Sequence, residues 1–120
     1  MAIVFYQKDA TVYAVHYKES ENPLDVSKLE WLFSGAKKVQ SDSLESFFVG
    51  PRREMITPWS TNAVEITQNM GISGILRIEE FTRVEDEQAA FDPMLQAFYK
   101  GLNQDTFTIF SLLLGEKQIL

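Results

Sequence analysis

The sequence predicts one α+β domain in which helices pack on one face of an antiparallel or mixed β-sheet. Runs of β-branched and aromatic residues alternate with segments of helical spacing, in the order β-β-α-β-α-β-α-β. The 120 residues are enough for one domain. The 45% hydrophobic and 23% charged content is typical of a folded globular chain, which excludes disordered and fibrous classes.

A β-hairpin is predicted at the N-terminus. Residues 2–6 and 11–17 are rich in β-branched and aromatic side chains, and the polar residues 7–10 separate them. The second run carries apolar groups on both faces, so we expect it to lie inside the sheet rather than at its edge.

The first helix is predicted to follow a polar loop. Asn22 is the expected N-cap, Pro23 the first helical position and Gly35 the stop. Apolar residues at helical spacing form the stripe expected to face the core, namely Leu29, Leu32, Phe33 and Ala36.

A polar connection over residues 37–43 leads to a strand at 44–49, which Gly50 and Pro51 close. The second helix has the clearest start in the chain, because Thr57 is a good N-cap and Pro58 suits the first turn. Its predicted core stripe ends before Gly71 and consists of Trp59, Ala63, Ile66 and Met70.

A long strand is predicted over residues 72–84, with Gly74 marking a bulge. One face is expected to carry Ile72, Leu76 and Ile78, and the other Ile75 and Phe81. Asp92 and Pro93 then predict a short helix to about Lys100, stopped by Gly101, and residues 106–110 predict a last strand.

Charge and composition narrow the class of partner. The net charge of −6 argues against general nucleic-acid binding, which needs a basic face. The second half is the more acidic, with four basic and nine acidic groups against seven and eight in the first. The chain has no cysteine, no apolar run of membrane-spanning length and no signal-peptide pattern. We therefore expect a cytoplasmic protein that binds neither nucleic acid nor membrane.

The local motifs predict no self-contained active site. His16 is the only histidine and lies in a predicted strand with no nucleophile beside it, so a structural role is expected. Glu79 and Glu80, like the acidic run 85–87, suit general acid–base or metal chemistry, but we expect them to be solvated surface. No catalytic residue and no metal ligand is predicted.

The stretch 50–63 is the candidate site. It places Arg52, Arg53 and several small polar groups around a strand end and a helix start. A helix N-terminus favours an anion, and arginine adds planar recognition of phosphate or carboxylate. The alternative is that Thr57 caps the helix, Trp59 fills the core and the arginines are solvated. The residues alone leave both interpretations open.

Two longer runs carry a resemblance to a known family. The run 49–52 (V-G-P-R) and the run 57–72 (T-P-W-S-T-N-A-V-E-I-T-Q-N-M-G-I) resemble the N-terminal segment of the large, single-chain phosphoribosylformylglycinamidine synthase. Residues 28–36 are similar to that family's first helix and residues 78–81 to the strand after its second. The resemblance covers nearly all of residues 1–110.

The resemblance implies a domain of an amidoligase of purine biosynthesis. That enzyme uses ATP, Mg²⁺ and glutamine to convert formylglycinamide ribonucleotide to formylglycinamidine ribonucleotide. Its N-terminal domain resembles a fused pair of the small subunit that the multi-chain enzyme carries separately. The small subunit bridges the synthase and the glutaminase and is thought to help route ammonia between them.

The resemblance also indicates which parts of the enzyme this chain lacks. The synthase with its ATP and Mg²⁺ sites and the glutaminase cysteine are absent, so we expect a non-catalytic, monomeric docking domain over residues 1–110 without a cofactor. Residues 111–120 do not resemble the family's passage into its linker and are expected to be a truncated or altered tail. The residues expected to face the synthase are Arg52, Thr57, Trp59, Ser60 and Asn62, with Arg52 near a phosphate.

A rival hypothesis is a free-standing interaction module that binds a protein partner or a small anion. Such a domain would expose an apolar or aromatic patch, since patches of this kind mark interaction surfaces.

Overall fold

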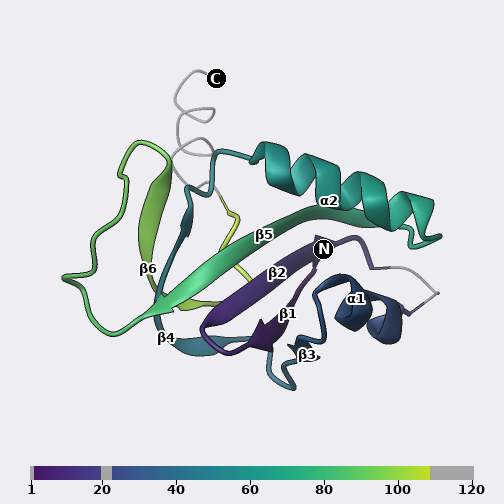
Figure 1. The fold of residues 1–120 in the computed structure, drawn as a ribbon, viewed down its shortest axis with the longest axis horizontal. Helices are drawn as coiled ribbons and strands as arrows, with labels where there is room; N and C mark the ends of the chain where they lie inside the picture. Colours follow the sequence, from purple (N-terminus) through teal and green to yellow (C-terminus); the bar gives the residue numbers. More distant parts are fainter. Residues whose placement is uncertain (1, 20–22, 109–120) are drawn as a thin grey trace, which may run out of the picture.

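The computed structural model describes residues 2–19 and 23–108. Its six-stranded sheet has the order β3-β1-β2-β5-β4-β6, and every pairing is antiparallel. Both helices lie on one face of the sheet, as Figure 1 shows. The predicted α+β class is confirmed. The elements are β1 (Ala2–Lys8), β2 (Thr11–Tyr17), α1 (Val26–Leu32), β3 (Lys37–Lys38), β4 (Leu44–Pro51), α2 (Pro58–Asn69), β5 (Ile75–Val84) and β6 (Gln96–Leu102).

The N-terminal hairpin forms as predicted. β1 pairs with β2 from Ala2 opposite Tyr17 to Lys8 opposite Thr11. β2 pairs with β5 along its other side, so it lies inside the sheet. Alternation along β2 sends Tyr13 and Val15 toward the helices and Val12 and Ala14 toward the opposite face.

Helix α1 starts later than predicted. The expected cap Asn22 lies outside the described residues, and Pro23 precedes the helix rather than opening it. Asp25 is the N-cap, because its carboxylate accepts a hydrogen bond of 3.0 Å from the N–H of Lys28. The core stripe is confirmed, with Leu29, Phe33 and Ala36 buried and Leu32 packed against them.

Helix α2 starts as predicted but presents a different face to the sheet. Thr57 caps it, and its buried residues are Ser60, Ala63 and Thr67. The predicted stripe is wrong at Trp59 and Ile66, which are 43% and 45% exposed. The cause is Ser60, whose hydroxyl accepts a hydrogen bond of 3.0 Å from the N–H of Ile78 in β5 and so turns its own side of the helix inward.

Strand β5 begins at Ile75, three residues later than predicted, because Gly74 has a φ of +84° and its carbonyl accepts from the N–H of Lys18. The bulge lies at Leu76, since His16 pairs with Arg77 and Tyr17 with Ile75. Because of this extra residue, the predicted assignment of side chains to the two faces of β5 is wrong. Ile75 and Ile78 both lie on the helix-bearing side, and Leu76 is exposed.

The predicted helix at 92–100 is wrong. Asp92 makes a single turn, in which its carboxylate accepts from the N–H of Met94 and its carbonyl from the N–H groups of Leu95 and Gln96. The chain then becomes β6 and pairs with β4. Pairing with a strand far away in the sequence overrides the local cap signal, and Gly101 lies inside the strand instead of ending a helix.

The last predicted strand is also wrong over its described part. Thr106 and Phe107 lie in a turn, held by hydrogen bonds between Asn103 and Thr106. Residues 109 and 110 and the predicted tail 111–120 lie outside the described residues. We call residues 103–108 the C-terminal turn.

Two hydrophobic clusters lie on opposite faces of the sheet. The helix-bearing face is packed by both helices over Val4, Tyr6, Val15 and Ile78. On the other face Phe107 of the C-terminal turn covers a second cluster, with its ring 6.2 Å from that of Phe81. The second cluster also contains Ile3, Phe5, Val12, Ala14, Phe48, Tyr99 and Leu102.

Candidate functional site

A buried ion pair organises the candidate stretch. Arg77 and Glu79 are neighbours on one face of β5, and Nε of Arg77 lies 2.9 Å from Oε2 of Glu79. Their side chains are only 6% and 1% exposed. Buried charges are retained where hydrogen bonds compensate for their desolvation, so the remaining donors and acceptors of this pair need partners.

The partners of Arg77 are backbone carbonyls of residues 52–57, which we call the 52–57 loop. Nη1 donates to the carbonyl of Arg53 at 2.6 Å, and Nη2 to those of Met55 and Arg52 at 2.9 and 3.3 Å. The ring of Phe107 stacks on the guanidinium at 4.3 Å. One side chain therefore holds three carbonyls of the loop against the sheet.

Glu79 holds the start of α2. Its carboxylate accepts two hydrogen bonds from Thr57, one of 3.1 Å from the N–H and one of 2.7 Å from the hydroxyl. That hydroxyl in turn accepts a hydrogen bond from the N–H of Ser60. The sequence predicts an anion at this helix N-terminus, and the anion there is the protein's own carboxylate. The prediction that Glu79 is solvated surface is wrong, because the α2 start and the 52–57 loop cover it.

The five predicted site residues fall into two groups. Thr57 and Ser60 face inward and support the loop and the helix. Arg52, Trp59 and Asn62 face outward. Nε of Arg52 lies 2.6 Å from Glu54 and its Nη1 donates weakly to the carbonyl of Pro93, while the side chain of Asn62 makes no hydrogen bond to the described part of the chain.

Sequence reasoning missed Arg77 and underestimated Glu79. The available signal was two opposite charges at i and i+2 of a predicted strand, which places both on one face among apolar neighbours. Such a pair is expected to be buried only when other groups of the fold supply hydrogen bonds to its remaining donors and acceptors.

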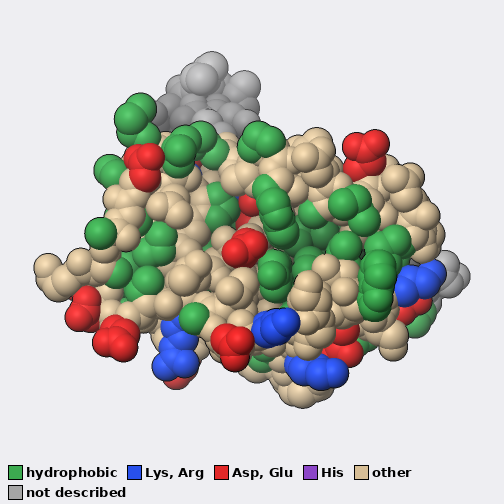
Figure 2. Space-filling model, viewed as in Figure 1, with side chains coloured by type: hydrophobic (Ala, Val, Ile, Leu, Met, Phe, Trp, Pro, Cys, Tyr) green, Lys and Arg blue, Asp and Glu red, His purple; other side chains and the backbone are tan. Residues whose placement is uncertain are grey.

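An aromatic row bridges the two helices on the helix-bearing face. The ring of Tyr13 stacks on Phe33 of the α1 C-cap at 4.4 Å and 7°, and lies 6.2 Å from Trp59 of α2 at 19°. Glu80 is directly opposite Tyr13 in the β2–β5 pairing and is exposed. Figure 2 shows hydrophobic side chains gathered on this face below α2, with an acidic side chain among them.

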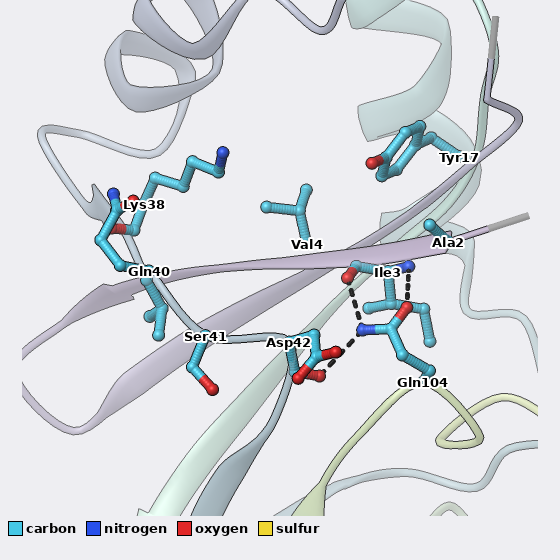
Figure 3. Close-up of a pocket in the computed structure, with 10 residues that line it drawn as sticks. Ala2, Ile3, Val4, Tyr17, Lys38, Gln40, Ser41, Asp42 and Gln104 are labelled. Carbon is cyan, nitrogen blue, oxygen red and sulfur yellow. Dashed lines mark hydrogen bonds between the residues drawn. The ribbon is translucent and has the colours of Figure 1, made fainter.

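A pocket of about 370 Å³ lies along the edge of β1 beyond the short β3. Figure 3 shows the side chain of Gln104 at one end, where its amide donates to the carbonyls of Ile3 and Asp42 and accepts from the N–H of Ile3. Lys38 and Tyr17 point toward each other above Val4. The polar end of this pocket is thus closed by the protein's own amide.

Two ionisable groups near the second cluster have shifted pKa values. Burial, with the positive charge of Arg77 adding to it, lowers the pKa of His16 from 6.5. Burial raises the pKa of Tyr99, whose hydroxyl donates 2.6 Å to the carbonyl of Pro51. These shifts are typical of structural groups. Within residues 2–19 and 23–108, no three histidine, cysteine, aspartate or glutamate side chains are grouped so that they could hold a metal ion.

Neither helix in the described part of the chain has the length and apolar character needed to cross a membrane.

The fold and the site define an α+β domain that presents a braced loop and a helix start at the side of an antiparallel sheet. A family model described as formylglycinamide ribonucleotide amidotransferase N-terminal matches residues 10–110. The chain belongs to this family, which indicates a domain of an enzyme of purine biosynthesis. No solved structure matches the chain.

Proposed function

We propose that the chain is a docking domain of an ATP- and glutamine-dependent amidoligase that makes formylglycinamidine ribonucleotide from formylglycinamide ribonucleotide. The family match over residues 10–110 supports the assignment of the parent enzyme. In this proposal the domain contacts the synthase and glutaminase domains and supports ammonia transfer between them. ATP and Mg²⁺ bind to the synthase domain, and the whole enzyme is cytoplasmic.

The observation that carries the proposal is the bracing of the 52–57 loop. Arg77 donates to three carbonyls of the loop, and Glu79 fixes Thr57 at the start of α2. Arg52, Trp59 and Asn62 are presented outward from this support. A surface held in one conformation before binding loses less conformational entropy when a partner docks.

The test is made in the whole enzyme, with Trp59→Ala and Arg52→Ala. The ratio of glutamine hydrolysed to amidine formed is measured for each variant. We expect the ratio to rise above one, because ammonia escapes when docking loosens. Trp31→Ala is the matched control, since Trp31 is 74% exposed on α1 and lies outside the proposed surface.

A ratio and a substrate KM that stay unchanged in both variants contradict the docking role. The isolated chain is a second check, since incubation with glutamine, ATP and the ribonucleotide should give no amidine. Measurable turnover by the isolated chain is incompatible with the proposal.

The second candidate is the free-standing interaction module. It is favoured by four exposed apolar side chains on and before α2: Met55, Ile56, Trp59 and Ile66. A protein partner suits this surface better than a small anion, because Glu54 pairs with Arg52 and Glu79 occupies the helix N-terminus. Coding sequence that runs on into a synthase supports the docking domain, and a stable dimer in solution supports the module.

A further inference from the structure

The aromatic row of Phe33, Tyr13 and Trp59 lies beside a carboxylate on the helix-bearing face. Tyr13 stands in the middle of the row, between the rings of Phe33 and Trp59. We call this row together with Glu80 the aromatic–acidic surface. Phe33 is buried, whereas 43% of Trp59 is exposed. The row is thus closed at the α1 end and open at the α2 end, where a planar group can stack on the indole.

Glu80 places a negative charge at this open end. It lies directly opposite Tyr13 across the β2–β5 pairing, and directly opposite residues share one face of the sheet. No hydrogen bond or ion pair joins Glu80 to any residue in the described ranges. Burial, together with the Glu80 carboxylate, raises the pKa of Tyr13.

One cation on this face, Lys8, has a partner of its own. Lys8 ends β1 beside Thr11 on the same side of the sheet, and its Nζ donates a hydrogen bond of 2.8 Å to the carbonyl of Ser34. It therefore serves the turn after α1 rather than Glu80. Within the described ranges the Glu80 carboxylate therefore has no partner, so it is available to a group from outside the chain.

We propose that the aromatic–acidic surface binds an arginine side chain of the partner domain, with the guanidinium stacked on Trp59 and paired with Glu80. Arginine fits because its guanidinium is planar and weakly hydrated, and it combines stacking with bidentate pairing to a carboxylate. A lysine ammonium can pair but cannot stack as a plane. The inference rests on the proposed docking function and names the group that docks.

The test uses the 120-residue chain and N-acetyl-arginine amide as the probe, followed by NMR. The Trp59 and Tyr13 resonances should shift saturably, whereas those of Trp31 should not move. N-acetyl-citrulline amide has the same shape without the charge and should bind more weakly, by up to about fivefold. N-acetyl-lysine amide should also bind more weakly than the arginine derivative.

Glu80→Gln should weaken binding of the arginine derivative by about fivefold, because it removes the charge and keeps the shape. Glu85→Gln, an exposed acid in the loop after β5, is the matched control and should leave binding unchanged. The proposal is overturned if citrulline or lysine binds as well as arginine, or if Glu80→Gln has no effect.

The two proposals fail separately. If Trp59→Ala uncouples the whole enzyme but the arginine derivative does not bind, the docking role stands and the arginine site is wrong. If the derivative binds as expected but Trp59→Ala leaves coupling unchanged, the aromatic–acidic surface recognises arginine and the docking role is wrong.

Discussion

Arg77 reaches with both terminal nitrogens into the loop that contains Arg53, and its Nη1 lies 2.6 Å from the Arg53 carbonyl oxygen. The guanidinium of Arg77 in β5 thus binds the backbone of the loop that carries Arg52 and Arg53. The side chain of Arg53 meanwhile lies over the ring of Tyr99 in β6, at 5.4 Å. The arginines of this region therefore serve different purposes: Arg77 supports the surface that Arg52 helps to form.

Arg77→Met should destabilise the domain strongly. The substitution leaves the buried Glu79 carboxylate without its charged partner and three loop carbonyls without a donor, which costs about 3–5 kcal/mol. The free energy of unfolding is measured by urea denaturation. Arg83→Met is the control, since Arg83 is exposed on the same strand and should cost less than about 0.5 kcal/mol. Equal losses in the two variants would be inconsistent with the bracing role.

The domain should lose stability in mild acid because of His16. Its pKa is lowered from 6.5 by burial, so the unfolded chain binds a proton more readily than the folded one. The free energy of unfolding should therefore be level above about pH 6.5 and fall as the pH drops below it. His16→Phe should remove this part of the pH dependence, as followed by urea titrations between pH 5 and 8. If the free energy of unfolding of His16→Phe depends on pH with the same slope, the titrating group is another residue.

Gly50→Ala should be poorly tolerated. A Cβ at this position would overlap the ring of Phe81, which packs directly on the backbone of β4. We expect a loss of about 1–3 kcal/mol from overpacking. The double variant with Phe81→Leu tests the cause, because the two losses should be less than additive if the clash is responsible. Strict additivity would point to another origin.

Gln104→Ala should open the edge of β1. The side-chain amide of Gln104 replaces a neighbouring strand at Ile3, where it binds both the N–H and the carbonyl. Without it, the N–H of Ile3 should exchange with solvent about five- to tenfold faster, since an amide hydrogen bond contributes about 1–1.5 kcal/mol. Amide hydrogen exchange measures this directly, and Gln40→Ala is the control. Unchanged exchange at Ile3 would contradict the edge-capping role.

The elements that could be predicted correctly are those determined by interactions between residues close together in the sequence. The hairpin and the start of α2 were predictable because turn and cap residues act within a few positions. The strand β6 was not, because Asp92 and Pro93 are equally good residues for a single turn. Its pairing with β4 depends on residues about fifty positions earlier, such as Val49 opposite Phe98.

The candidate site was predictable in outline only. The stretch around Arg52 and Trp59 could be found from its residue types, but its support could not. The carbonyls that Arg77 binds are 22 to 25 residues away in the sequence. Likewise, the orientation of Trp59 depends on one hydrogen bond from Ile78 to Ser60, which rotates α2 relative to its apolar stripe.

The bond between Gln104 and Ile3 joins residues 101 positions apart. During synthesis, the first strand must wait for the last turn before its outer edge is closed. At the usual 5–20 residues per second this interval is about 5–20 s. Throughout that time the edge of β1 at Ile3 is open in the nascent chain, and an open strand edge can pair wrongly with another strand until residue 104 has been added.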